Sequence, residues 1–481
     1  MEAKDLIGLS LLFATTLVCV GFCCLSHRAR DVAFFLMTAA PAISYKLDIN
    51  FFSHFWYRGT TRGLELTLID TLAIGVLVGS LIRPRPGESH FYWPASLGLM
   101  LTFFGYACLS IIVSDPKVYG LFELSKMVRG ILFFVAAALF IRSERELAIM
   151  VLALCCIVCF EGAWALKQRV LEGLYRVPGT LDDPNSFSMY LCTVSPIFVA
   201  AFHSTLPKHI RWLSIVAIAA AAVSILLTVS RAGIPIFALV TFGTAVFCVS
   251  WQITLKKVAT VVLIGICIGG LVFKSWDILK ARYTQSSLAE EYLDENTFES
   301  RGYFLRLARE IVDDRFWGVG LNNWSYWVSK KYGALLGTPF EDYDDLNYTP
   351  SKEILSSISY AAPAHNLAAL TVGELGVPGL LIFALLWLRW FQMGVIFLWK
   401  RMPTAMHRMG VGLFFGACGI FLQSITEWTF RQTHIFLTFN VMLGVLASLY
   451  RVKQQARQKP IEIPVTPEST EYQFVGVAAR S

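Results

Sequence analysis

Long apolar runs are the feature that most constrains this chain. About thirteen can be counted, and most have the roughly 18–22 residues that a helix needs to cross the hydrocarbon core of a bilayer. A backbone in lipid must satisfy its own hydrogen bonds, which favours helices. We therefore predict an all-α polytopic membrane protein with about 12–14 transmembrane helices. The runs centre on residues 6–25, 31–45, 64–82, 93–113, 121–141, 147–166, 184–203, 211–229, 231–250, 256–273, 363–390, 406–426 and 433–451.

The composition agrees with a membrane protein and argues against a soluble or a nucleic-acid-binding one. The chain is 56% hydrophobic and only 16% charged, whereas about a quarter of a soluble domain is charged. The first run is too long for the core of a signal peptide and lacks a small-residue cleavage site, so we interpret it as a span. The net charge of +7 lies mostly in short loops and the tail, which does not indicate nucleic-acid binding.

Basic residues occur in every second link between the apolar runs. Such residues mark cytoplasmic loops, which places the C-terminus inside and, with thirteen spans, the N-terminus outside. The remaining links then face outward: 46–62, 114–120, 167–183, 230–231, 274–362 and 427–432.

The chain then divides into four regions. Residues 1–273 hold about ten transmembrane helices, 274–362 form a large outer loop, and 363–451 hold about three more helices. Residues 452–481 lack an apolar period and are predicted to be a disordered cytoplasmic tail. Within the loop, one apolar stripe at helical spacing predicts an amphipathic helix over 299–314. The stripe consists of Phe304, Leu307, Ala308 and Ile311.

Four polar groups in the outward links are not explained by orientation. The first is a Pro/Gly turn from Arg176 to Asn185, which could equally be a helix cap with a surface turn. The second is Ser230-Arg231, between two apolar runs. An Arg at the bilayer centre costs about 2.5–3.5 kcal/mol, so Arg231 either snorkels or faces a cavity or an anion.

The third group lies inside the loop, and the fourth lies just after it. Arg301 begins the amphipathic segment, where most charges should form a solvated face. His365-Asn366 comes after the loop and is followed by Glu374. A lone His at an interface is often only structural, but neighbouring Arg residues would favour a neutral imidazole able to act as a general base.

Taken together, these residues resemble the O-antigen ligase and polymerase family of bacterial inner-membrane glycosyltransferases. The resemblance covers roughly residues 170–430 and lies in an ordered set of short motifs. The motifs are Gly179-x-x-x-x-Pro184-Asn185, Ser230-Arg231-x-Gly233, Ser300-Arg301, Gly318-x-Gly320 with Asn322-Asn323, and His365-Asn366 with Glu374-x-Gly376.

The resemblance implies a periplasmic active site that passes a glycan from undecaprenyl pyrophosphate to a hydroxyl of an acceptor sugar. It implies no metal and no cofactor, and it makes Arg231, Arg301 and His365 the essential positions. We expect Arg176, Asn185, Ser230, Asn366 and Glu374 to bind substrate. The expected partners are the lipid-linked glycan, an acceptor glycan or lipid A core, the bilayer, and other polysaccharide-assembly proteins.

Several alternatives stay open at this point. Ligase and polymerase differ only in the acceptor, which the sequence does not separate. A secondary transporter would also carry buried charges, but near the bilayer midplane and often with internal repeats. A non-catalytic partner of a polysaccharide assembly system is a third class. Four charges on the outer face could bind an anionic acceptor, although ordinary surface charge is the simpler interpretation: Arg58, Arg62, Glu427 and Arg431.

Overall fold

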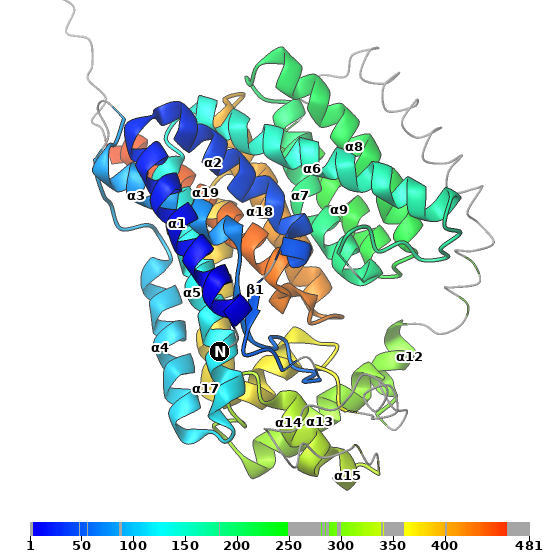
Figure 1. Ribbon diagram of the computed structural model, residues 1–481. Coiled ribbons are helices and arrows are strands. Elements are labelled where there is room, and N and C mark those ends of the chain that lie inside the picture. The colour runs from blue at the N-terminus through cyan, green and yellow to red at the C-terminus, as the bar shows by residue number, and fades with distance from the viewer. Residues whose placement is uncertain are drawn as a thin grey trace, which may run out of the picture.

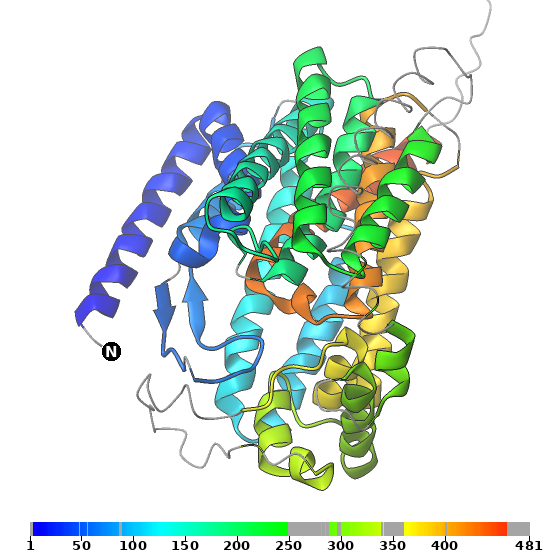
Figure 2. The same cartoon turned by 90° about the vertical axis from the view of Figure 1, so that its right-hand side faces the viewer.

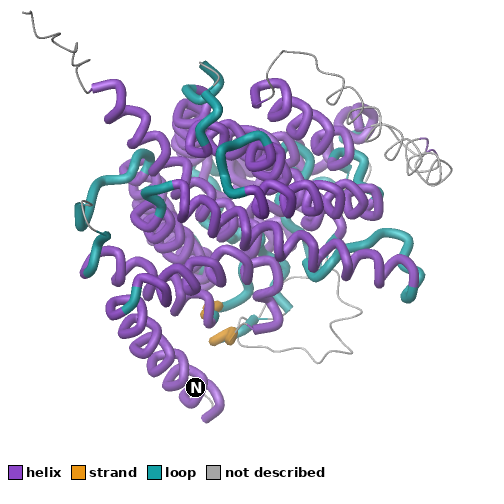
Figure 3. Tube along the Cα trace, turned by 90° about the horizontal axis from the view of Figure 1, so that it is seen from above, coloured by secondary structure: helices purple, strands orange, loops and turns teal. Residues whose placement is uncertain are grey.

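The computed structural model describes residues 3–458 except for 48, 55, 86–88, 182, 249–279, 281–283, 285–287, 296–299, 338–339, 341–359 and 400–401. The fold is all-α and polytopic, as predicted. Seen from above, the helices pack side by side as a bundle, with two short strands at its periphery (Figure 3). The tail that was predicted to be disordered lies outside the described residues, apart from the end of the last helix.

The helices of the bundle have the following bounds. They are α1 (Ala3–Leu25), α2 (His27–Ala39), α3 (Leu68–Ile82), α4 (Leu97–Val113), α5 (Lys117–Phe140), α6 (Glu144–Val170), α7 (Pro184–Phe202), α8 (Lys208–Thr228), α9 (Gly233–Cys248), α17 (Leu367–Val395), α18 (Ala405–Ser424) and α19 (Thr433–Gln458).

Shorter elements connect them. They are the 3₁₀ helix η1 (Ala40–Leu47), the strands β1 (Ile49–Phe51) and β2 (Leu64–Leu66), α12 (Leu288–Leu293), α13 (Arg301–Asp314), α14 (Trp324–Trp327), the π-helical turn η2 (Val328–Tyr332), α15 (Gly333–Leu335) and the 3₁₀ turn η3 (Thr429–Arg431).

Most of these helices suit a bilayer. Among the described residues, seven are long and apolar enough to cross one, namely α1, α6, α7, α8, α17, α18 and α19. Three more, α3, α4 and α9, are apolar but shorter, with 15, 17 and 16 residues. Helix α5 has 24 residues and buries several charges. The predicted runs coincide with these helices, except that 31–45 divides between α2 and η1 and that 256–273 lies outside the described residues.

A short β-hairpin was not predicted. Strand β1 pairs antiparallel with β2, with Ile49 opposite Leu66, so the apolar run placed at 64–82 begins as a strand. Helix α3 starts only at Leu68, because Thr67 and Asp70 form a capping box in which the Thr67 amide donates to Asp70 Oδ2 at 2.7 Å. The predicted boundary was therefore four residues too early.

The links between helices gather at two ends of the bundle. At one end, Asn322 of the loop hydrogen-bonds to the backbone of Thr60, Thr61 and Tyr119. At the other end, Asp31 pairs with Arg85 and Arg145. Figures 1 and 2 show α13, α14 and α15 together at the first end, which we call the loop end. Described residues of three links that were predicted to face outward, 46–62, 114–120 and 274–362, are in contact there.

Helix α17 is broken near the loop end, and the loop hydrogen-bonds to backbone carbonyls that the break leaves without a helical donor. Gly376 has a non-helical backbone (φ 67°, ψ −174°), and Pro378 has no amide hydrogen to donate. A loop turn rich in glycine and aromatic residues, 316–324, supplies the missing donors. The Val319 amide reaches Gly373 O at 2.9 Å, and the Gly320 amide reaches Glu374 O at 2.7 Å.

Gly318 makes this docking possible, and its substitution provides a test. Its φ is +79°, and a Cβ there would lie 2.4 Å from the carbonyl oxygen of Glu374. We expect Gly318→Ala to destabilise the protein by about 1–3 kcal/mol, measured as a lower thermal unfolding midpoint in detergent. Gly337→Ala is the matched control, because Gly337 has φ +78° with no neighbouring atom within 4 Å. Equal losses in the two variants would show that the loop does not dock tightly against α17.

Candidate active site

The short link between α18 and α19 is the centre of a polar site at the loop end. Its residues Ile425, Thr426 and Glu427 receive hydrogen bonds from three distant parts of the chain. Asn366 Nδ2 donates to Ile425 O at 2.8 Å, and Arg301 Nε donates to Thr426 O at 3.3 Å. The Glu427 carboxylate accepts the third set of contacts, described next.

Glu427 is buried, with 7% of its surface exposed. Its Oε1 accepts from Asn185 Nδ2 at 3.0 Å and lies 3.3 Å from Arg301 Nη2. Its Oε2 lies 2.7 Å from His365 Nδ1. One carboxylate therefore joins an Arg from α13, an Asn from α7 and the His that precedes α17.

A polar pocket opens beside Glu427 and encloses about 390 Å³, its opening included. Three guanidinium groups and one carboxylate line it, which gives an excess of two positive charges. The lining consists of Arg176, Asn185, Ser230, Arg231, Ala232, Arg301, Gln423, Thr426 and Glu427. Such a pocket suits a ligand that carries more than one negative charge.

Arg231 reaches the pocket because α8 ends abruptly. Val229 adopts a left-handed backbone (φ 50°) after the last helical residue. Ser230 Oγ then accepts from the Gly233 amide at 3.2 Å, which starts α9. Between them Arg231 lies in the turn rather than inside a helix. Gly233 is required here, because a Cβ would lie 1.7 Å from Ser188 Oγ on α7.

Arg176 reaches the pocket from the turn before α7. Pro184 occupies the first turn of that helix, and Asp183 caps it by accepting from the Asn185 amide at 2.8 Å. Arg176 Nη2 donates to Asn185 Oδ1 at 2.8 Å, and its Nε donates to Thr228 O at 3.3 Å. The segment is thus a helix cap, and it also delivers Arg176 and Asn185 to the pocket.

Arg301 is positioned by the amphipathic helix. Ser300 caps α13 by accepting from the Tyr303 amide at 3.1 Å. The predicted apolar stripe is buried, which fixes the rotation of the helix. Arg301 in its first turn then faces Glu427, and Phe304 lies against the His365 ring, with centroids 5.5 Å apart.

The Glu427 contact determines how His365 can act. An ionised carboxylate only accepts hydrogen bonds, so Nδ1 carries the hydrogen and the lone pair of the neutral ring lies on Nε2. The sequence interpretation considered only the cationic neighbours of His365. The structure adds a carboxylate that holds one tautomer and one ring orientation, which is the arrangement found in His-based general bases.

The structure does not bring every predicted residue into the pocket. His365 adjoins it through Glu427 rather than lining it. Asn366 caps α17, because its Oδ1 accepts from the Ala369 amide at 2.9 Å, and it also binds Ile425 O. Glu374 lies elsewhere: its Oε2 is 2.6 Å from Arg431 Nη1, and it is 1% exposed. It therefore serves a buried ion pair and not the polar pocket.

The surface-charge interpretation was wrong for two of four residues. Arg58 and Arg62 are exposed, as expected. Glu427 and Arg431 are 7% and 8% exposed and are bound to charged partners. A clue was present in the sequence: a carboxylate lies in a six-residue link, on the face where the unexplained Arg residues gather. Gln423 of the pocket gave no comparable signal, because it lies inside an apolar run.

Comparison with known proteins adds a finding that does not depend on this geometry. The family model described as O-antigen ligase matches residues 215–384. The match covers 170 of the chain's 481 residues and supports a general function in joining or polymerising glycans at a membrane. A comparison with curated proteins found no match.

The matched O-antigen ligase domain contains part of the site. Ser230, Arg231, Arg301 and His365 lie within it. Arg176, Asn185 and Glu427 lie outside its limits, yet they line the same pocket. Segments of the chain before and after the matched residues thus complete the site.

Proposed function

We propose that this protein transfers a glycan from a polyprenyl pyrophosphate carrier to a sugar hydroxyl, with the pocket facing the periplasm of a bacterial inner membrane. The observation that carries the proposal is the pocket itself, in which Arg176, Arg231 and Arg301 lie around the carboxylate that orients His365. The donor is undecaprenyl pyrophosphate linked to a glycan, by resemblance to the family.

The arginines suit the leaving group. Breaking the bond between sugar and phosphate leaves growing negative charge on the pyrophosphate. Guanidinium groups bind phosphate oxygens in pairs and remain charged at any physiological pH. Fixed cations in a poorly hydrated pocket stabilise such a transition state without a large reorganisation. The proposal therefore requires neither a metal ion nor a cofactor.

His365 suits the nucleophile. The acceptor hydroxyl must lose a proton as it attacks the anomeric carbon. In our proposal Nε2 of His365 accepts that proton, and Glu427 stabilises the imidazolium that forms. The products are a new glycosidic bond and the lipid pyrophosphate.

Transport is less well supported. The break in α17 resembles the broken helices of transporters, whose freed backbone groups bind ions or substrate. Here the carbonyls of Gly373 and Glu374 accept from the loop, and Tyr106 Oη donates to Leu375 O at 2.8 Å. These groups are therefore already occupied by protein.

A reconstituted assay tests the proposal. Purified protein in vesicles receives a lipid-pyrophosphate glycan and an acceptor saccharide, with and without EDTA. We expect a longer saccharide and free lipid pyrophosphate in both cases. A requirement for an added divalent cation would contradict the arginine pocket as the stabilising group. Transfer from a sugar nucleotide in place of the lipid donor would contradict the substrate class.

The carboxylate gives a sharper test. Glu427→Gln keeps the shape of the side chain but places an amide among the donors of Arg301, Asn185 and His365. We expect kcat for transfer to fall on the order of 10²–10⁴-fold, by analogy with carboxylates that orient catalytic histidines. Donor affinity should change less, because the arginines remain. Glu310→Gln on α13, outside the pocket, serves as the control and should leave kcat unchanged.

A further inference from the structure

The break at Gly376 makes the first part of α17, residues 367–375, a separate short helical segment. Gly376 has φ 67° and ψ −174°, so the helix is interrupted there. Asn366 caps the start of this segment and binds Ile425 O of the α18–α19 link at 2.8 Å, and His365 precedes it. The direction of the segment therefore decides where His365 lies.

The segment is attached to the α18–α19 link at both of its ends. At its start, His365 Nδ1 lies 2.7 Å from Glu427 Oε2. At its end, Glu374 Oε2 lies 2.6 Å from Arg431 Nη1. Attachment at the start alone would let the segment pivot, whereas attachment at both ends fixes its position and its direction against the link.

The loop also contacts the end of the segment, but it does not replace this ion pair. Two amides of the loop turn 316–324 donate to Gly373 O and Glu374 O. These bonds join the segment to a part of the chain that does not carry Glu427. The Glu374–Arg431 pair joins it to the link that does.

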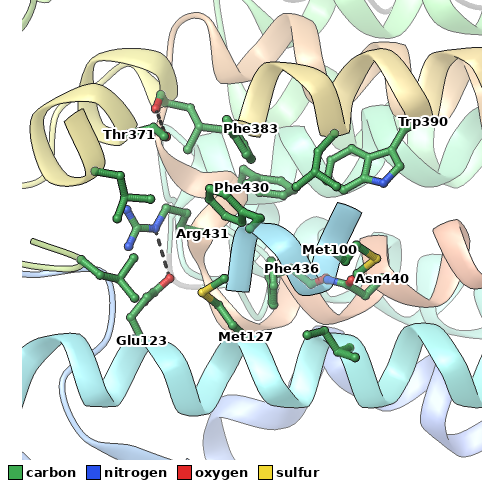
Figure 4. A pocket seen from close by; sticks show the side chains of 16 residues that line it. Met100, Glu123, Met127, Thr371, Phe383, Trp390, Phe430, Arg431, Phe436 and Asn440 are labelled. Carbon is green, nitrogen blue, oxygen red and sulfur yellow. Dashed lines mark hydrogen bonds and ion pairs between the residues drawn. The ribbon is translucent and has the colours of Figure 1, made fainter. Parts of the chain in front are cut away.

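Arg431 is itself held by α5. Its Nε lies 3.1 Å from Glu123 Oε1, and its backbone carbonyl accepts from Lys126 Nζ at 2.6 Å. Figure 4 shows the Arg431 side chain directed toward Glu123. The four side chains Glu123, Lys126, Glu374 and Arg431 are 1–8% exposed, and their formal charges balance. Arg431 is thus a fixed point to which Glu374 is bound.

We propose that Glu374 and Arg431 are positioning residues for His365. Their ion pair fixes segment 367–375 against the link and so keeps His365 Nδ1 on the Glu427 carboxylate. A buried ion pair often adds little net stability once desolvation is counted, and this one acts through the single geometry that it imposes. The consequence for transfer rests on the proposed function, in which His365 is the base, whereas the consequence for the His365 ring does not.

The tautomer of His365 tests the inference without any reaction. The full-length protein, with ¹⁵N in its histidine rings, is placed in vesicles at about pH 9, where a histidine ring is neutral. His365 is assigned by the NMR signals that are lost in His365→Ala. We expect the wild type to hold the hydrogen on Nδ1 alone, and Glu374→Gln, which keeps the shape but not the charge, to populate both tautomers. A single Nδ1–H tautomer in Glu374→Gln would overturn the inference.

Asp70→Asn is the matched control. Asp70 Oδ1 lies 2.8 Å from Arg129 Nε, and the two residues are 5% and 4% exposed. This buried ion pair joins α3 to α5, neither of which lines the polar pocket. We expect Asp70→Asn to lower the thermal unfolding midpoint as Glu374→Gln does, yet to keep the wild-type tautomer. Both tautomers in Asp70→Asn would show a general loosening and contradict a specific role of Glu374.

Kinetics separate positioning from stability. Glu374→Gln should lower kcat for transfer about 10–10²-fold, the effect of misplacing a catalytic group by about 1 Å. KM for the lipid donor should change little, because the arginines of the pocket remain. In a Glu427→Gln background the same change should cost less than about twofold, because the contact through which it acts is already lost. An equal loss in both backgrounds would refute the positioning role.

Failure of this inference is distinguishable from failure of the proposed function. If the wild type transfers no glycan while Glu374→Gln still mixes the two tautomers, the proposed function is wrong and the positioning role stands. If Glu374→Gln does not fold, Glu374→Asp takes its place in both measurements. It keeps the charge but shortens the side chain by one methylene, which stretches the pair with Arg431, and a wild-type tautomer in that variant would likewise overturn the inference.

Discussion

Replacing Arg301 with lysine is expected to reduce glycan transfer almost as far as replacing it with alanine, by about 10²–10³-fold in kcat. Lysine keeps the positive charge but loses the planar fork that binds two phosphate oxygens at once. In the folded protein the guanidinium also spans two acceptors, with Nε at Thr426 O and Nη2 at Glu427 Oε1. An ammonium group donates from a single nitrogen, so it cannot reproduce the two separate donor positions, Nε and Nη2, that make these contacts.

Arg309→Lys is the matched control for this prediction. Arg309 lies two turns further along α13 and is exposed. The variant should transfer glycan at the wild-type rate and unfold at the same temperature. If Arg301→Lys retained full activity in the reconstituted assay, the bidentate role of Arg301 in binding pyrophosphate would be wrong, and only its charge would matter.

Replacing His365 with alanine should abolish measurable transfer, with a loss on the order of 10²–10⁴-fold, which is the usual contribution of a general base. The side chain touches Glu427 and the ring of Phe304, and its removal leaves the buried contacts of Asn366 and α17 in place. The variant should therefore insert into membranes and purify like the wild type. Donor binding, measured separately with the lipid-linked glycan, should persist.

His90→Ala controls for the loss of an imidazole, because His90 is exposed and bonds only the backbone carbonyl of Leu81 among the described residues. The same pair of variants can be compared in cells. A deletion strain complemented with His365→Ala should lack the surface polysaccharide that His90→Ala restores. Wild-type transfer by purified His365→Ala would remove His365 as the base and favour a non-catalytic role in assembly.

The fold class followed directly from the sequence. Apolar runs of membrane-spanning length leave the backbone little choice but helices, and eleven of the thirteen predicted runs each coincide with one described helix. The amphipathic stripe from Phe304 to Ile311 is buried as its spacing predicted. The hairpin before α3 was missed because the apolar residues Leu64 and Leu66 extend the run, and only the Thr67–Asp70 capping box marks the true start.

Only part of the candidate site could be predicted from the sequence. Arg231 stood out because an Arg between two apolar spans has few explanations, and the family motifs pointed to Arg301 and His365. The shared partner Glu427 was taken for surface charge, and Glu374 for a substrate ligand. Burial separates these cases, and burial of a link residue depends on which helices surround it. Glu427 and Arg431 are four positions apart, yet one enters the polar pocket and the other a buried ion cluster.

The sequence by itself determined that this chain folds as membrane-spanning helices, and it singled out the cations that stand apart from the basic links. Those properties depend on hydropathy and local charge, which act over a few residues. Only the tertiary structure decided that Glu427 meets His365, Arg301 and Asn185, because those contacts join segments from 62 to 242 residues apart. Packing of α7, α13, α17 and α18 brings them together, and no local pattern encodes that distance.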